Sequence, residues 1–304
     1  MQPQVPDMLA TNGLHHVTAT ASDPQRNLDF YRRALGLHLV KTTVNFDDPF
    51  VYHLYFGDAA GRPGTIYTSF PFPDARRGRA GPGMASTIGF AMPDAADRAQ
   101  ALQAQGIATE RLTRFDAPVW AFTDPDGQRL DLSEGPEGLA GVTLWLDDPE
   151  PTATLLQDVL GYAETGREAD GPGQRRRLER PGTGPGRFID LYHQPDAPRA
   201  ASGAGTMHHI AFRARDRAHQ DALADALRGR GLQPSERKDR SYFESIYVRE
   251  PGGVLFEIAT DAPGFAHDEP PEALGRRLKL PPQHEPRRAE IEARLPTLTY
   301  QHGA

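Results

Sequence analysis

Residues 205–212 read GTMHHIAF and residues 13–18 read GLHHVT, so the same pair of adjacent histidines occurs twice, almost 200 residues apart. Both pairs lie in apolar, β-branched segments that predict strands. In each copy the second histidine, His16 or His209, lies seven residues before an aspartate, so the two segments are in register. One such pair has no structural meaning by itself, whereas two in register indicate an internal repeat.

The repeat continues beyond these strands. Amphipathic segments that end near a glycine predict helices over residues 28–37 and 218–232, and further strands follow each of them. Weaker copies of the first strand start at 86–94 and 141–150, and a Pro/Gly turn precedes the last strand of every copy. The pattern predicts an α+β fold built from four βαβββ modules.

Composition narrows the class of protein. The chain has 304 residues, a net charge of −7 and a pI near 5.9, with scattered basic residues that favour neither nucleic acid nor an anionic membrane as partner. Residues 1–13 lack the features of a signal peptide, so we expect a cytoplasmic protein. Because the sequence has no cysteine but 11 histidines, any metal must be held by His, Asp or Glu.

Four βαβββ modules in a chain of this length resemble the vicinal oxygen chelate superfamily, which includes glyoxalases, bleomycin-resistance proteins and extradiol dioxygenases. The resemblance implies that two modules together form one cup-shaped, glyoxalase-like barrel, with metal ligands on the first and last strand of a module. We expect the modules to span residues 10–75, 83–136, 137–196 and 203–262, and a C-terminal segment, 263–304, to wrap the surface.

The pairing of the modules follows from the residues at these ligand positions. In chain order the positions hold His16 and Ser69, Thr87 and Asp131, Gly141 and Leu191, and His209 and Glu257. Only pairing of the first module with the fourth collects two histidines and a carboxylate, the facial triad of non-haem Fe(II) oxygenases. The second and third modules then form a metal-free barrel, in which we interpret Asp131 as structural or solvated.

Each of these residues also has a simpler reading. A lone histidine on a strand is more often a half-exposed or hydrogen-bonded residue than a ligand, and Glu257 could face solvent from an edge strand. Inside a barrel, however, Glu257 in VLFEIAT would need a cation or a hydrogen-bond partner. The metal hypothesis depends on the recurrence of the paired histidines.

Three segments narrow the resemblance to ring-cleaving dioxygenases that act on hydroquinones and related diols: DRSYFESIYVREPGGVLFEIATD (239–261), GLHHVTATASDPQRNLDFYRRALGL (13–37) and EPRRAEIEARLP (285–296). It implies that His16, His209 and Glu257 bind iron. It also implies that five further residues surround the substrate: His15, Thr18, His208, Arg240 and Tyr247. Strict alternation along a strand would turn His15 and His208 away from the ligands unless the strand bends.

The favoured function is therefore an Fe(II)-dependent extradiol-type dioxygenase that inserts both atoms of O₂ into a hydroquinone or catechol-like diol, with Mn, Co, Ni or Zn as substitute metals. One alternative is a glyoxalase-like isomerase or lyase, which would need a second carboxylate where Ser69 stands. Another is a metal-free, drug-sequestering binding protein. The sequence does not decide between a monomer and a homo-oligomer. Seven histidines stay unassigned: His38, His53, His193, His219, His267, His284 and His302.

Overall fold

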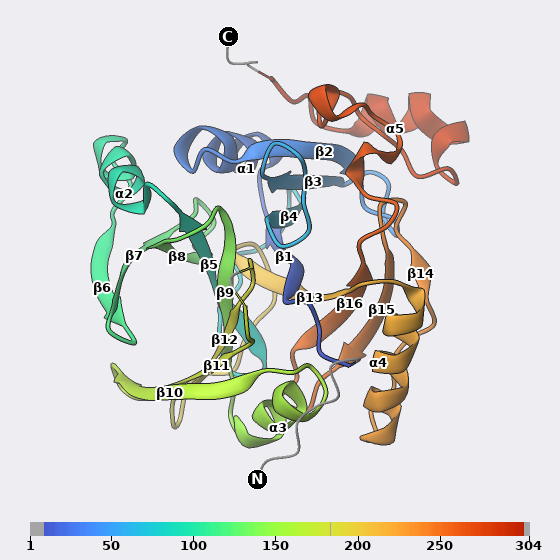
Figure 1. The fold of residues 1–304 in the computed structure, drawn as a ribbon. Coiled ribbons are helices and arrows are strands. Elements are labelled where there is room, and N and C mark those ends of the chain that lie inside the picture. The colour runs from blue at the N-terminus through green and yellow to red at the C-terminus, as the bar shows by residue number, and fades with distance from the viewer. Residues whose placement is uncertain (1–8, 183, 301–304) are drawn as a thin grey trace.

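A computed structural model describes residues 9–182 and 184–300 and shows two curled eight-stranded sheets with a few helices outside them (Figure 1). The start of the N-terminal segment, residues 1–8, and the end of the C-terminal segment, 301–304, lie outside the described residues. A strand, a helix and three strands recur four times along the chain. The predicted α+β fold with βαβββ modules in two cup-shaped sheets is confirmed.

The first sheet joins the two ends of the chain in the strand order β14-β15-β16-β13-β1-β4-β3-β2. Strands β1 and β13 pair antiparallel at its centre. Four strands come from the N-terminal end: β1 (Leu14–Ala21), β2 (His38–Val44), β3 (Tyr52–Gly57) and β4 (Ile66–Pro71). Four come from the C-terminal end: β13 (Thr206–Ala214), β14 (Lys238–Asp239), β15 (Glu244–Arg249) and β16 (Leu255–Thr260).

The second sheet repeats this arrangement with the middle of the chain, in the order β10-β11-β12-β9-β5-β8-β7-β6. Its central antiparallel pair is β5 and β9. The strands are β5 (Met84–Met92), β6 (Glu110–Arg114), β7 (Ala117–Thr123), β8 (Arg129–Glu134), β9 (Gly138–Trp145), β10 (Ala163–Asp170), β11 (Gly173–Glu179) and β12 (Phe188–His193).

One helix follows the first strand of each module: α1 (Pro24–Asp29), α2 (Ala95–Ala104), α3 (Glu150–Asp158) and α4 (Arg217–Gly229). The aspartates that follow the two histidine pairs cap α1 and α4, because Asp23 accepts a hydrogen bond from the Arg26 backbone N–H and Asp216 from that of His219. The predicted helix over 28–37 was wrong in its bounds. Helix α1 starts earlier and passes into a π-helical turn, η1 (Phe30–Ala34).

Both histidine pairs lie at irregular points of the central strand pair. Leu14 pairs with Phe212 and His16 with Ala211, so His15 is an extra residue in β1. A second register shift, between Thr18 and Ala19, makes His208 the extra residue in β13. A β-bulge of this kind turns consecutive side chains to the same side of a strand. The bulges are therefore the departures from regular alternation that bring His15 and His208 to the side of the metal-ligand positions.

One apolar core joins the two sheets to the helices. The ring of Tyr31 from η1 stacks on Tyr67 of β4 with centroids 3.9 Å apart, and Tyr67 meets Phe90 of β5 at 6.5 Å. All three side chains are buried. Each buried aromatic side chain contributes a few kcal/mol to stability. This continuous core fixes the position of one cup relative to the other.

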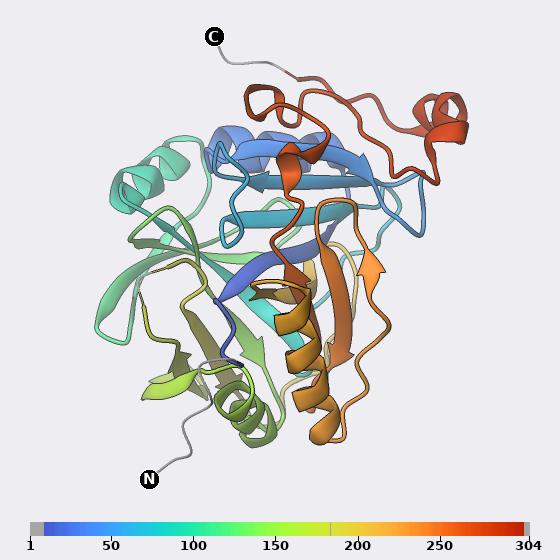
Figure 2. The ribbon, with the colours of Figure 1, turned by 45° about the vertical axis from the view of Figure 1, so that its right-hand side comes forward.

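After β16 the C-terminal segment crosses the outer edge of the first sheet at β2 (Figure 2). It contains three short 3₁₀ turns and one helix: η2 (Phe265–His267), η3 (Pro271–Ala273), η4 (Glu285–Arg287) and α5 (Arg288–Arg294). The Lys41 ammonium of β2 lies 2.6 Å from Asp268 Oδ1 and 2.5 Å from Glu269 Oε2. Across the described part of the chain, no helix has the length and apolar character needed to cross a membrane.

Candidate metal centre

His16, His209 and Glu257 come from three adjacent strands of the first sheet, β1, β13 and β16. All three side chains are buried. His16 Nε2 lies 3.3 Å from His209 Nε2, and Glu257 Oε2 lies 2.9 Å from His209 Nε2 and 3.5 Å from His16 Nε2. The three predicted ligand atoms thus form a small triangle on the floor of the first cup.

This triangle has the dimensions of a metal site. Two ligand atoms that each lie about 2.1 Å from a divalent metal, at a right angle, are roughly 3.0 Å apart. Glu257 Oε1 accepts a hydrogen bond from the Ser245 hydroxyl, whereas the buried Oε2 accepts none. An unsatisfied carboxylate oxygen beside two imidazole nitrogens is costly without a cation. Two nitrogens and one oxygen on a single face suit the facial arrangement of Fe(II), and also Mn, Co, Ni or Zn.

The charges agree with this donor set. Burial opposes the ionisation of Glu257, but His16 and His209 beside it hold its pKa well below the usual range. Burial lowers the pKa of His209, which favours the neutral imidazole that coordinates metals. The site therefore offers an ionised Glu257 carboxylate and a neutral His209 imidazole.

The first histidine of each pair contacts the second. His15 Nδ1 lies 2.9 Å from His16 Nδ1, and His208 Nδ1 lies 2.7 Å from His209 Nδ1. If Nε2 of His16 and of His209 binds a metal, Nδ1 of each ring carries the hydrogen. It then donates a hydrogen bond to Nδ1 of His15 or His208. Such hydrogen bonds fix the tautomer and ring orientation of metal-binding histidines. The bulges thus place His15 and His208 in contact with His16 and His209.

A cavity of about 100 Å³ opens above the ligands. Arg240 and Tyr247, both predicted near the substrate, line it, and Arg240 Nε donates a hydrogen bond to the Tyr247 hydroxyl at 3.0 Å. Burial and the charge of Glu257 raise the pKa of Tyr247, so its phenol stays neutral and can donate. An arginine and a neutral phenol on one wall suit an oxygen atom that carries negative charge.

The other predicted site residues lie differently. His208 lines the cavity, whereas His15 and Thr18 are buried behind its wall. His15 packs against Phe243 with ring centroids 5.0 Å apart. The hydroxyls of Thr18 and Thr68 are 3.0 Å apart. His15 and Thr18 therefore support the wall and have no direct access to a ligand in the cavity.

Sequence reasoning missed His53, a buried residue of β3 that also lines the cavity. Its Nε2 lies 2.8 Å from the Thr68 hydroxyl and its Nδ1 lies 3.0 Å from the Tyr55 hydroxyl. Burial holds its pKa well below the usual range, so it is a neutral imidazole. The one sequence signal was the alternation in VYHLYF, which places His53 and Tyr55 on the same face of a strand.

Comparison with known proteins is consistent with this geometry. The model of the Glyoxalase/Bleomycin resistance protein/Dioxygenase superfamily matches residues 13–132 and 138–258. The chain is 41% identical over 305 residues to "Putative ring-cleaving dioxygenase MhqO" of Bacillus subtilis (strain 168), covering 94% of this chain and 96% of that protein. It is 33% identical over 310 residues to the chlorohydroquinone/hydroquinone 1,2-dioxygenase of Sphingobium indicum, covering 93% and 94%.

A solved structure is similar over almost its whole length. The crystal structure of "putative dioxygenase from Bacillus subtilis subsp. subtilis str. 168" superposes with a TM-score of 0.91 at 40% identity, covering 97% of this chain and 99% of that one. The likeness spans both cups and the C-terminal segment between residues 263 and 300. The two proteins therefore share the complete two-cup fold.

Proposed function

The chain belongs to the Glyoxalase/Bleomycin resistance protein/Dioxygenase superfamily, and within it we propose that this protein is a non-haem Fe(II) ring-cleaving dioxygenase. Its substrates would be O₂ and a hydroquinone or catechol-like diol, with both oxygen atoms entering the product. The observation that carries the proposal is the convergence of His16, His209 and Glu257 within 3.5 Å beneath a cavity. The names of the similar proteins support the same reaction class.

The iron, once bound, would supply the electron transfer that lets ground-state O₂ react with an electron-rich ring. His16, His209 and Glu257 would hold it and leave three positions open. Their summed charge of −1 leaves +1 with a divalent ion, which favours a substrate bound as a phenolate. The protein's part is then to bind the ring, remove its proton and exclude water.

The cavity wall has residues for each of these tasks. Arg240 directs its guanidinium at the cavity beside the Tyr247 hydroxyl, and both can donate hydrogen bonds to a phenolate oxygen. His53 is a neutral base in the same cavity lining. Because its two ring nitrogens contact the Thr68 and Tyr55 hydroxyls, a substrate proton would reach it through Tyr55: the Tyr55 oxygen would take the proton while its own O–H proton passes to His53 Nδ1.

The shape of the cavity favours a small substrate. Its volume of about 100 Å³ suits one aromatic ring with small substituents. Phe46, Phe70 and Phe243 supply apolar surface around that ring. A chlorinated or methylated hydroquinone fits this description, and the name of the Sphingobium indicum relative contains chlorohydroquinone and hydroquinone.

The isomerase alternative requires a second carboxylate from β4. Ser69 occupies that position, and its hydroxyl donates a hydrogen bond to Asn27 Oδ1 at 2.7 Å. Among the described residues, the group of acidic and histidine side chains that could hold a metal consists of His16, His209 and Glu257. One carboxylate per site favours the dioxygenase over a glyoxalase-type reaction.

The test is anaerobic reconstitution with Fe(II), followed by oxygen-electrode traces with hydroquinone, chlorohydroquinone, methylhydroquinone and catechol. We expect one O₂ consumed per substrate and a new ring-opened chromophore. His209→Ala should abolish both, whereas the control His38→Ala, at an exposed histidine of β2, should retain them. Full activity in His209→Ala, or no O₂ uptake by protein that holds one iron per chain, would refute the proposal.

A further inference from the structure

The second cup is hollow. A cavity of about 730 Å³ opens inside the second sheet, well within the range of small-molecule sites. Its wall includes residues of β5 to β12. These strands are the repeats of the eight strands that form the first cup. The sequence predicts that this cup lacks metal ligands. A cavity of this size can still hold a small molecule.

Strand register shows which residues replace the metal ligands there. Asp131 of β8 pairs with Gly89 of β5, as Glu257 of β16 pairs with Ala211 of β13. Asp131 is therefore the counterpart of Glu257. The counterparts of His16 and His209 are Gly141 and Thr87. The second cup thus keeps the carboxylate of the triad but has no histidine to hold a metal with it.

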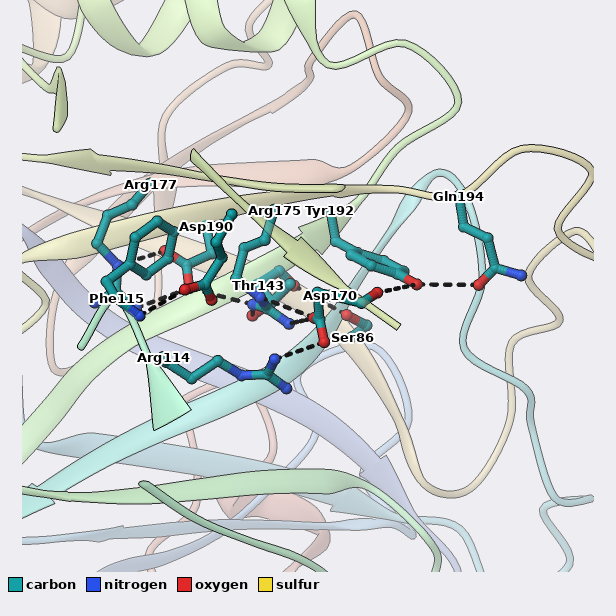
Figure 3. Close-up of polar contacts among 11 residues, drawn as sticks. Ser86, Arg114, Phe115, Thr143, Asp170, Arg175, Arg177, Asp190, Tyr192 and Gln194 are labelled. Atoms are coloured by element: carbon teal, nitrogen blue, oxygen red, sulfur yellow. Dashed lines mark hydrogen bonds and ion pairs between the residues drawn. The ribbon is translucent and has the colours of Figure 1, made fainter. Parts of the chain in front are cut away.

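A network of ion pairs reaches this cavity through Arg114, Asp170 and Arg175, and Figure 3 shows its contacts. Asp170 lies between two guanidinium groups, with Oδ1 2.6 Å from Arg114 Nη1 and Oδ2 2.6 Å from Arg175 Nη2. Arg175 also contacts Asp190 at 3.2 Å, and Asp190 accepts two hydrogen bonds from Arg177. Three arginines and two aspartates form this network, so its net charge is +1.

Asp131 lies beside this network and can balance its charge. It lines the cavity, and among the described residues it has no hydrogen bond or ion pair of its own. Burial raises its pKa, while Arg114 and Arg175 act in the opposite direction. With Asp131 ionised the network sums to zero, and the exposed Glu110 and Arg129 on the cavity wall also cancel. A charged ligand would disturb this balance, whereas a neutral one would not.

Aromatic side chains face the same space. Trp145 and Tyr192 contact each other edge to face at 5.3 Å, and Phe122 adds a third ring to the wall. The indole N–H of the buried Trp145 has no hydrogen-bond acceptor among the described residues. That nitrogen is itself buried, so the cavity offers a ligand the Asp131 carboxylate and flat aromatic surface.

We propose that the second cup binds one uncharged, hydroxylated aromatic molecule, whose hydroxyl donates a hydrogen bond to Asp131 and whose ring lies against Trp145 and Tyr192. A hydroxyl group on the ring can donate a hydrogen bond to the Asp131 carboxylate. An aromatic ring uses the flat wall better than an aliphatic chain does. This site is independent of the metal centre and of the reaction proposed there.

The natural fluorescence of Trp145 reports on binding. The sequence has two tryptophans, and Trp120→Phe removes the other, which lies on β7 packed against the core. Metal-free protein with this substitution is titrated with phenol, benzoate or benzylammonium at pH 7, with excitation at 295 nm. We expect phenol alone to change the Trp145 emission in a saturable way. The added substitution His209→Ala should leave this response unchanged, because it alters only the first cup.

A carboxylate variant and its control complete the test. Asp131→Ala removes the acceptor and should weaken phenol binding about 10-fold or more. The control Asp97→Asn changes an exposed carboxylate on α2 and should bind phenol as before. Equal affinity for benzoate or benzylammonium, an Asp131→Ala affinity equal to that of the control, or no saturable response would overturn the proposal. Loss of binding in His209→Ala would assign the signal to the first cup and overturn it as well.

Discussion

Replacing Lys41 by methionine should detach the C-terminal segment from the first cup. The Lys41 side chain is fully buried, and its ammonium pairs with two carboxylates of that segment, those of Asp268 and Glu269. These two differ in exposure, because the Asp268 side chain is 30% exposed and that of Glu269 only 4%. Without the lysine, Asp268 can be hydrated where it stands, but Glu269 becomes a buried charge without a partner.

The magnitude follows from that uncompensated charge. Removing one partner of a buried ion pair costs about 3–5 kcal/mol. At about 2–4 °C per kcal/mol for a protein of a few hundred residues, the melting temperature should fall by roughly 6–20 °C. The segment also carries Phe265, which packs at 5.1 Å against Tyr55 on the cavity wall. Turnover should therefore fall together with stability.

Thermal unfolding and hydrogen exchange of residues 265–280 measure the two effects, loss of stability and release of the segment. The informative comparison is Lys41→Met with the double variant Lys41→Met and Glu269→Leu. Replacing both buried partners by apolar side chains is often neutral or stabilising, so the double variant should recover most of the lost stability. If it melts as low as the single variant, or if the single variant melts like the parent protein, the reasoning about the buried pair is wrong.

Three further substitutions test other parts of the molecule. His15→Leu removes the hydrogen bond to His16 Nδ1 and should weaken Fe(II) binding about 10–100-fold, measured by chelator competition. Arg240→Met should lower kcat about 10²–10³-fold with little change in iron content, as loss of an oxyanion donor does. Burial raises the pKa of Asp124 from 3.8 to about 6, so its ionisation should remove up to about 3 kcal/mol of stability as pH rises from about 4 to 6. Asp124→Asn should abolish that loss, and melting curves at pH 4 and 8 that differ as in the parent protein would contradict the assignment.

The features that sequence reasoning predicted are those that depend on local pattern or on recurrence. Asp23 and Asp216 are visible as helix caps because capping acts over three residues. The repeat then places His16, His209 and Glu257 on the inner strands of one sheet, and the structure brings their ligand atoms within 3.5 Å. Recurrence carried this prediction because the first and fourth modules have a histidine at the same position of their first strand.

Other features depend on contacts that no local pattern encodes. Lys41 looks like an ordinary strand residue, and its partners lie more than 200 residues away. His53 has no recurring counterpart among the histidines, so only its position on β3, facing the cavity, assigns it a place in the site. The hollow of the second cup follows from side-chain volumes across eight strands, which the pairing of modules alone does not determine.

The bulges connect these two kinds of feature. The register shifts that make His15 and His208 extra residues of the first sheet recur at matching places in the second sheet. There the extra residues are Ala140 and Ser86. The irregularity is therefore a property of the repeated scaffold, and the residue placed at it determines its use. Imidazoles at the bulges contact the candidate metal ligands in one cup, whereas the other cup has the small residues Ala140 and Ser86 at the same points.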